Sequence, residues 1–313
     1  MTSDARVELA VNTFVWYSPL TDSLLAALAP RVASFGFEAI ELPLEEVGDW
    51  SPERTAELLD RCGLKRAVGA VMPPGRELVA ADQAIVEQTQ GYLRGCVDAA
   101  AIVGANVVTG PLYASVGRTW RMSPDESTAI FTELRENLRP VADYAAKAGV
   151  QMGLEPLNRY ETSLINTTEQ AMELLDGLPP EGIGLSLDAY HMNIEEKQLR
   201  AAFRAGADRL VHFQVSGNDR GAPGSDHIDW QEIGMALQEI GYRGMVSIES
   251  FTPENKTIAK AASIWRPLAE SQDALAMDGL AFLRPWRDTW LCYADSDDPL
   301  SPGAAISTSE SRR

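Results

Sequence analysis

The sequence predicts an α/β fold built as a single (β/α)8 barrel of the TIM type. Eight short apolar segments recur along the chain, and each is followed by a longer segment with helical periodicity. This alternation is typical of parallel strands joined by helices. A chain of 313 residues also has a length at which such a barrel commonly forms one domain.

The expected strands coincide with the apolar segments, at residues 7–13, 38–42, 66–72, 106–110, 150–155, 183–188, 210–215 and 245–249. An open, doubly wound sheet would produce much of the same pattern. However, the sequence contains no GxGxxG or Walker-type loop, which disfavours dinucleotide binding and phosphoryl transfer. We therefore expect residues 1–290 to form one catalytic barrel domain. Residues 291–313 are rich in Ser, Asp and Pro and are expected to form a disordered tail.

Helix boundaries are marked by capping residues between the expected strands. Ser51 precedes a proline, and Ser123 precedes a proline with Glu126 three positions beyond, which predicts a capping box. Asn166 followed by Glu169 predicts a third helix start. Glycines that separate a helix from the next strand predict the helix ends. These glycines are Gly36, Gly63, Gly104, Gly149 and Gly241.

The overall composition limits the classes of partner. The formal net charge of −18 leaves no basic surface to neutralise phosphates, so we expect no nucleic-acid partner. Cys62, Cys96 and Cys292 are odd in number and widely spaced, which predicts neither a disulfide framework nor a zinc cluster. No signal-peptide pattern and no stretch of membrane-spanning length is present. These features predict a cytoplasmic protein without a membrane partner.

Four oxygen-bearing side chains lie at the ends of the last four expected strands. Glu155, Asp188, Gln214 and Glu249 close the runs VQMGLE, GIGLSLD, LVHFQV and GMVSIE. Any one of them alone is better explained as a loop starter or helix cap. In a barrel, however, the carboxyl ends of the strands meet at one mouth. Carboxylate and amide oxygens suit Mg²⁺ or Mn²⁺, so the four residues together predict a divalent metal site.

At these residues the chain resembles the sugar isomerases and epimerases of the xylose-isomerase-like barrel, particularly D-tagatose 3-epimerase and its relatives. The resemblance is strongest in GLEPLNRYE, SLDAYHMN, HFQVSGNDRGAPG and SIESF, and it is weak in the first third of the chain. It implies that Glu155, Asp188 and Glu249 bind the metal. It also implies proton removal next to the carbonyl of a keto-sugar, with Glu155 and Glu249 as candidate bases on opposite faces of the substrate.

The resemblance further implies substrate contacts from Glu161, His191 and Arg220. An imidazole titrates near neutral pH, so His191 is also a candidate catalytic acid or base. Phe14, Trp16 and Tyr17, near the end of the first expected strand, are expected either to form an apolar wall over the sugar, with Trp16 as the candidate substrate contact, or to pack in the core. Two residues before Gln214, His212 faces the same side of its strand. We expect His212 to be a partner of the metal ligands or a satisfied core histidine.

Gln214 departs from the epimerase pattern, in which this strand carries HxH and the second histidine binds the metal. A glutamine here resembles other branches: hydroxypyruvate isomerase, inosose dehydratase, dehydroshikimate dehydratase and the α subunits of C-glycoside deglycosidases. We therefore expect β-elimination that cleaves the C–C glycosidic bond of a 3-keto C-glycoside, with a small β subunit as partner. In that reaction His191 or a metal-activated water removes the proton. The alternatives are a ketose 3-epimerase or sugar isomerase, and a non-catalytic sugar-binding or assembly subunit; a homo-oligomer is the other expected assembly.

Overall fold

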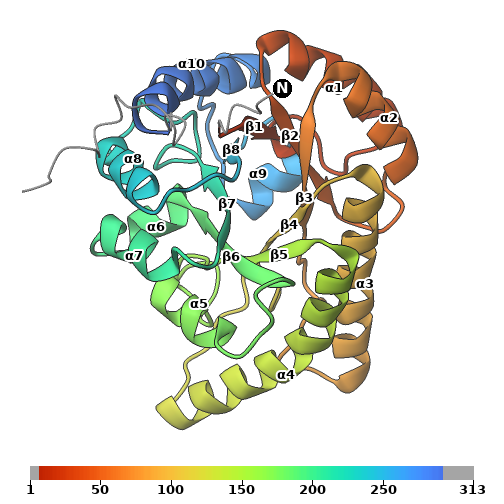
Figure 1. Cartoon of the computed structure of the whole chain (residues 1–313), viewed down its shortest axis with the longest axis vertical. Helices are drawn as coiled ribbons and strands as arrows, with labels where there is room; N and C mark the ends of the chain where they lie inside the picture. The colour runs from red at the N-terminus through yellow and green to blue at the C-terminus, as the bar shows by residue number, and fades with distance from the viewer. Residues whose placement is uncertain (1–6, 292–313) are drawn as a thin grey trace, which may run out of the picture.

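The computed structural model describes residues 7–291, which form one closed barrel of parallel strands (Figure 1). Each strand pairs with the next, and β8 pairs with β1 to close the ring. The predicted fold class is therefore confirmed. The strands are β1 (Leu9–Asn12), β2 (Ala39–Leu44), β3 (Lys65–Ala70), β4 (Val107–Gly110), β5 (Gln151–Leu154), β6 (Ile183–Asp188), β7 (Leu210–Val215) and β8 (Val246–Ile248).

Helices surround the barrel on its outside, and the long last helix, α10, lies between α8 and α1 in the ring (Figure 1). A short 3-10 helix, η1 (Thr13–Val15), follows β1 directly. The α-helices are α1 (Asp22–Phe35), α2 (Pro52–Cys62), α3 (Gln83–Val103), α4 (Pro124–Ala148), α5 (Thr168–Leu175), α6 (Ala189–Glu195), α7 (Leu199–Gly206), α8 (Trp230–Glu239), α9 (Lys256–Ala261) and α10 (Gln272–Trp290).

The capping residues act largely as the sequence predicts. Ser51 caps α2, and Ser123 with Glu126 forms a complete capping box at the start of α4. The third predicted cap is wrong by one residue, because the N-cap of α5 is Thr167. Asn166 instead donates two hydrogen bonds to main-chain carbonyls of the loop before α5, where its side chain satisfies acceptors of the turn.

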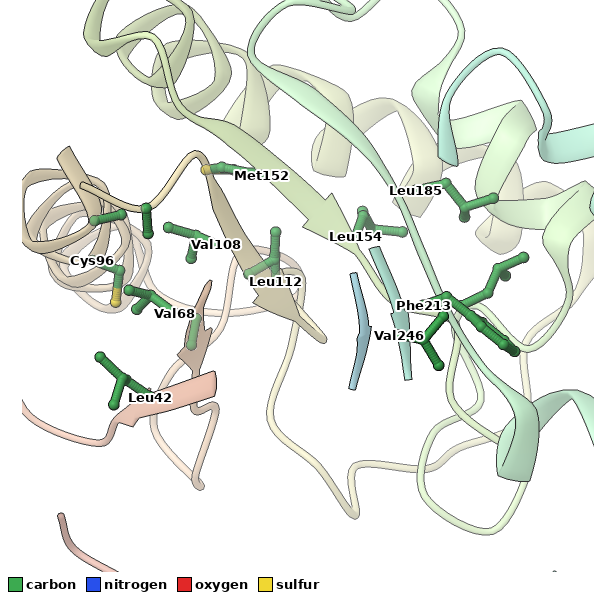
Figure 2. Packing of buried hydrophobic residues seen from close by; sticks show 14 of the residues in the cluster. Leu42, Val68, Cys96, Val108, Leu112, Met152, Leu154, Leu185, Phe213 and Val246 are labelled. Carbon is green, nitrogen blue, oxygen red and sulfur yellow. The ribbon is translucent and has the colours of Figure 1, made fainter. Parts of the chain in front are cut away.

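The hydrophobic core lies between the outer face of the barrel and the helices. Figure 2 shows apolar side chains from successive strands, among them Val68, Val108, Met152, Leu185 and Phe213, in this layer. Because side chains alternate along a strand, the residues next to these apolar residues within each strand face the barrel interior. Several of those interior residues are polar and buried, namely Asn12, Glu41, Thr109, Ser186, His212, Gln214 and Ser247. The inward positions therefore supply polar groups to the mouth of the barrel.

A second, smaller apolar cluster lies beside the mouth. It consists of Phe14, Phe251, Ile258, Ala259 and Ile264, which come from η1, from the segment after β8, from α9 and from the segment after α9. In Figure 1, α9 lies close to β8 and β1 near the centre of the view. Hydrogen bonds from this segment to main-chain carbonyls of η1 hold it in place. One side of the mouth is therefore covered by apolar groups.

The tail is expected over residues 291–313. Its first residue, Leu291, is buried, and residues 292–313 lie outside the described part of the chain. Between residues 7 and 291, no helix is both long enough and apolar enough to cross a membrane.

Candidate functional site

The structure brings the four predicted metal ligands to the same end of the barrel. Glu155 directly follows β5 and Glu249 directly follows β8, whereas Asp188 ends β6 and Gln214 lies near the end of β7. Asp188 and Gln214 are neighbours in register across β6 and β7. Glu155, Asp188 and Gln214 are buried, and Glu249 is partly buried. The barrel geometry therefore places four oxygen-bearing side chains at one mouth.

Glu155 and Asp188 form a tight cluster with His191, and each residue offers one ligand atom within 4.8 Å of the others. The Nε2 atom of His191 is 3.6 Å from Oε1 of Glu155 and 3.8 Å from Oδ2 of Asp188. The Asp188 carboxylate also accepts the main-chain N–H of Tyr190 and thereby caps α6. Since His191 lies in the first turn of α6, this cap holds the imidazole beside the carboxylates.

Arg220 links the carboxylates across the mouth. Its Nη1 atom binds Oδ2 of Asp188 and lies 3.3 Å from Oε2 of Glu249, and its Nη2 lies 2.9 Å from Nε2 of His191. The guanidinium also stacks on the rings of Tyr190 and Phe251, 4.0 and 5.0 Å from their centroids. Arg220 has a positive φ of 67°, a conformation that non-glycine residues adopt rarely. The positively charged guanidinium of Arg220 is therefore buried among the candidate metal ligands.

The sequence analysis missed Glu41, a fully buried carboxylate on β2. Its Oε1 accepts hydrogen bonds from Nε2 of Gln214 at 2.8 Å and from Nδ2 of Asn12 at 2.7 Å. Its Oε2 lies 2.8 Å from Nε2 of His212. His212 therefore contacts the same carboxylate that accepts from Gln214. A signal for Glu41 was available, because it is the single charged residue in the buried strand AIELPL.

The other predicted contacts differ in their position. Glu161 accepts a hydrogen bond from Nδ2 of Asn158 at 2.8 Å, and the N–H of Asn158 is 3.0 Å from Nδ1 of His191. Glu161 is therefore one residue removed from the cluster. Trp16 is buried, and its Nε1 donates to Asp273 at the start of α10.

Phe14, rather than Trp16, is connected to the carboxylates through packing. Its ring packs edge-on against Phe251, with 6.4 Å between centroids, and the Phe251 ring in turn contacts the guanidinium of Arg220. Of these two aromatic residues near the end of β1, Phe14 therefore packs toward the charged groups, whereas Trp16 packs toward α10.

The electrostatics of the mouth favour an added cation or retained protons. Burial, followed by the charges of Glu249 and Asp188, raises the pKa of Glu155 well above its usual range. Burial raises the pKa of Glu249 to about 8 although Arg220 opposes the shift, and burial likewise raises the pKa of Asp188. Burial and the charge of Arg220 lower the pKa of His191 well below its ordinary value. The imidazole of His191 is therefore neutral. The one positive charge of Arg220 does not balance the negative charges that the three carboxylates carry when they are ionised.

The donor atoms fit a hard divalent cation. Within residues 7–291, two buried side-chain oxygens of the carboxylate or amide type have no hydrogen-bond partner, Oε1 of Glu155 and Oε1 of Gln214. A buried acceptor without a donor is costly unless another group satisfies it. Both atoms belong to predicted ligands, and both are of the oxygen type that Mg²⁺ and Mn²⁺ prefer.

Comparison with known proteins agrees with this geometry. The family model of the xylose isomerase-like TIM barrel matches residues 29–285. A probable ketose 3-epimerase from Synechocystis sp. is 32% identical over 286 residues, which cover 91% of this chain and 98% of the relative. A 3-dehydro-D-guloside 4-epimerase from Escherichia coli is 35% identical over 114 residues, 36% of this chain and 44% of its own length.

Solved structures give the same result. A D-allulose 3-epimerase from Methylomonas sp., in complex with D-allulose, is 28% identical with a TM-score of 0.83, covering 90% of this chain and 97% of that one. A D-psicose 3-epimerase from Clostridium cellulolyticum H10, with D-tagatose, is 26% identical with a TM-score of 0.82, covering 90% and 99%. The chain therefore belongs to the xylose isomerase-like TIM-barrel family, and its homologues include ketose 3-epimerases.

Proposed function

We propose that this chain is a divalent-metal-dependent ketose 3-epimerase. The observation that carries the proposal is the pair Glu155 and Glu249, two carboxylates that reach one mouth from β5 and β8 with raised pKa values. Epimerisation removes a proton from one face of a carbon and returns a proton to the other face. It therefore needs two proton-transfer groups that approach the substrate from different sides.

The comparisons favour this alternative over the β-elimination that Gln214 led us to expect, because these relatives are sugar epimerases rather than C-glycoside lyases. The expectation of a small β subunit depended on the lyase interpretation and loses its support with it. Some support for keto-glycosides remains in the partial match to the 3-dehydro-D-guloside 4-epimerase, so these compounds belong in the test panel.

Glu155, Asp188, Gln214 and Glu249 are the residues that would hold Mn²⁺ or Mg²⁺ in this proposal. A divalent ion bound there would stabilise the negative charge that develops on the substrate's carbonyl oxygen as the adjacent carbon loses its proton. Glu155 and Glu249 also transfer the protons. Burial raises the pKa of both carboxylates above the usual range of a glutamate and so raises their basicity.

His191 and Arg220 bind and orient the sugar in this mechanism. The lowered pKa of His191 makes its neutral imidazole a weak base, so we assign it as a hydrogen-bond donor to a substrate oxygen rather than as the proton-abstracting base of the lyase interpretation. Arg220 is always charged and offers several N–H donors to hydroxyl or carbonyl oxygens at the mouth. Phe14 and Phe251 cover the apolar side of the sugar.

The test is to incubate the purified chain with D-fructose, D-allulose and D-tagatose, with Mn²⁺ or with EDTA, and to separate the products by chromatography. The proposal predicts Mn²⁺-dependent interconversion of sugars that differ only at carbon 3. A parallel incubation with a 3-keto C-glycoside scores aglycone release. Aglycone release without conversion of any ketose would establish elimination instead and overturn the proposal.

A further inference from the structure

We propose that Glu41 is a positioning residue that fixes the side-chain amide of Gln214, so that the amide oxygen rather than the amide nitrogen is presented as a metal ligand. The inference rests on the proposed metal site and assigns a role to a residue outside the ligand set. It concerns the one ligand of this chain whose two ends are chemically different but nearly equal in shape.

The hydrogen bonds of Glu41 define the orientation of the amide. An ionised carboxylate only accepts, and Glu41 faces three donors: Nδ2 of Asn12, Nε2 of His212 and Nε2 of Gln214, at 2.7 to 2.8 Å. Rotating the Gln214 amide by half a turn would place its oxygen against the carboxylate. Two acceptors would then face each other without a proton between them, in a fully buried position where water cannot intervene.

This arrangement leaves the amide oxygen of Gln214 available to bind a cation. With Nε2 bound to Glu41, the Oε1 of Gln214 is buried and has no hydrogen-bond partner within residues 7–291. Its strand neighbour in register is Asp188, which belongs to the ligand cluster. The opposite orientation would present two N–H groups to the cation. Glu41 therefore selects the ligating orientation of a neutral side chain.

Asn12 links Glu41 to a second candidate ligand, Glu249. The Oδ1 of Asn12 accepts the main-chain N–H of Phe14 at 2.9 Å, so its amide is also oriented, with Nδ2 directed to carboxylates. Nδ2 donates to Glu41 and lies 3.4 Å from Oε1 of Glu249. Asn12 on β1 and Glu41 on β2 are not predicted ligands themselves. Through these hydrogen bonds they support two predicted ligands, Gln214 on β7 and Glu249 directly after β8.

The experiment is a double-mutant cycle on Mn²⁺ affinity, measured as free Mn²⁺ by electron paramagnetic resonance and requiring no substrate. Glu41→Gln is expected to weaken Mn²⁺ binding about 10- to 100-fold, the usual effect of removing a residue that orients a ligand. In a Gln214→Ala background the same change is expected to have less than about a 3-fold effect, because no amide remains to be oriented. Equal losses in both backgrounds would mean that Glu41 acts only through its charge, and would overturn the proposal.

A matched control is Glu77→Gln. Glu77 is also a buried carboxylate with several donors, from Ser115 and Arg118, but it lies outside the candidate site. It is expected to lower stability without changing Mn²⁺ affinity. If Glu41→Gln fails to fold, Glu41→Asp keeps the charge, withdraws the carboxylate from Gln214 and is expected to show the same loss.

Failure of the metal site and failure of the positioning role give different results. If the unaltered chain binds no Mn²⁺, the metal site is wrong and the role of Glu41 falls with it. If the unaltered chain binds Mn²⁺ and Glu41→Gln binds it equally well, the metal site stands and only the positioning role is overturned.

Discussion

The main-chain N–H of Asn158 donates to Nδ1 of His191 across 3.0 Å, and this contact determines which imidazole nitrogen can carry a proton. A main-chain donor cannot rotate away, so Nδ1 must accept. In a neutral ring Nε2 then bears the hydrogen, and it points toward Glu155 and Asp188. The guanidinium of Arg220, which also only donates, lies 2.9 Å from this Nε2, so we expect an oxygen of the bound sugar to accept from both groups.

The imidazole of His191 is therefore expected to stay neutral near neutral pH. Burial and the charge of Arg220 lower the pKa of His191 well below its usual range, so its ring should stay uncharged near pH 6.5, where an ordinary histidine titrates. Nitrogen-15 NMR of labelled histidine, with His191→Gln to assign the resonance, measures this directly. A chemical-shift transition of that resonance near pH 6.5 would show that the imidazole ionises and would return it to the list of candidate bases.

The metal-free protein is expected to lose stability as pH rises from about 4 to 8. An unfolded glutamate titrates near about 4.3. In the folded chain, burial raises the pKa of Glu249 to about 8, and the pKa of Glu155 is raised in the same direction. The folded state therefore binds more protons than the unfolded state across this interval, and its stability falls as those protons are lost.

Mn²⁺ should reverse that loss, because it binds the deprotonated carboxylates. Thermal unfolding with Mn²⁺ or EDTA, repeated at several pH values, is the measurement. The stabilisation by Mn²⁺ is expected to grow from pH 5 to pH 8. A stabilisation that is the same at every pH would contradict the assignment of raised pKa values to the ligand carboxylates.

Replacing either proton-transfer carboxylate is expected to reduce epimerisation by about 10²- to 10⁴-fold, the range typical of a lost general acid or base. The variants are Glu155→Gln and Glu249→Gln, with bound Mn²⁺ measured in each to separate lost chemistry from lost metal. Glu155→Gln should also raise the melting temperature of the metal-free protein at pH 8, since it removes a buried carboxyl whose ionisation is opposed by burial and by the charges of Glu249 and Asp188. A lower melting temperature would argue against crowding of like charges at this site.

Gln214→His is expected to change the metal preference. An imidazole is a better ligand than an amide oxygen for Co²⁺ and Ni²⁺, whereas oxygen donors suit Mg²⁺ and Mn²⁺. The ratio of Co²⁺ to Mg²⁺ affinity, measured by calorimetry, should rise in the variant. An unchanged ratio would indicate that residue 214 is not a ligand.

Much of the fold was predictable because the signals for it are local. Each barrel strand is a short apolar run, and the expected and observed limits differ by no more than a few residues. The four strand-end ligands could be proposed for the same reason, since the barrel topology brings strand ends together. Their roles remain proposals.

The rest depended on contacts between residues far apart in the chain. Glu41 and Gln214 are separated by 173 positions, and nothing near either one in the sequence indicates the hydrogen bond between them. The choice between Trp16 and Phe14 depended on the turn of η1, which directs the two rings to different neighbours. Gln214 alone also gave the wrong emphasis on elimination, because one ligand position carries less information than similarity along nearly the whole chain.

The central claim is that Glu155 and Glu249 exchange a proton at carbon 3 of a ketose. The most direct measurement is incubation of the Mn²⁺-loaded protein with D-allulose in D₂O, followed by proton NMR of the recovered sugars. We expect D-fructose to form with deuterium at carbon 3 and recovered D-allulose to gain deuterium at the same carbon. Full conversion with the original hydrogen retained at carbon 3, or no exchange in any ketose of the panel, would contradict it.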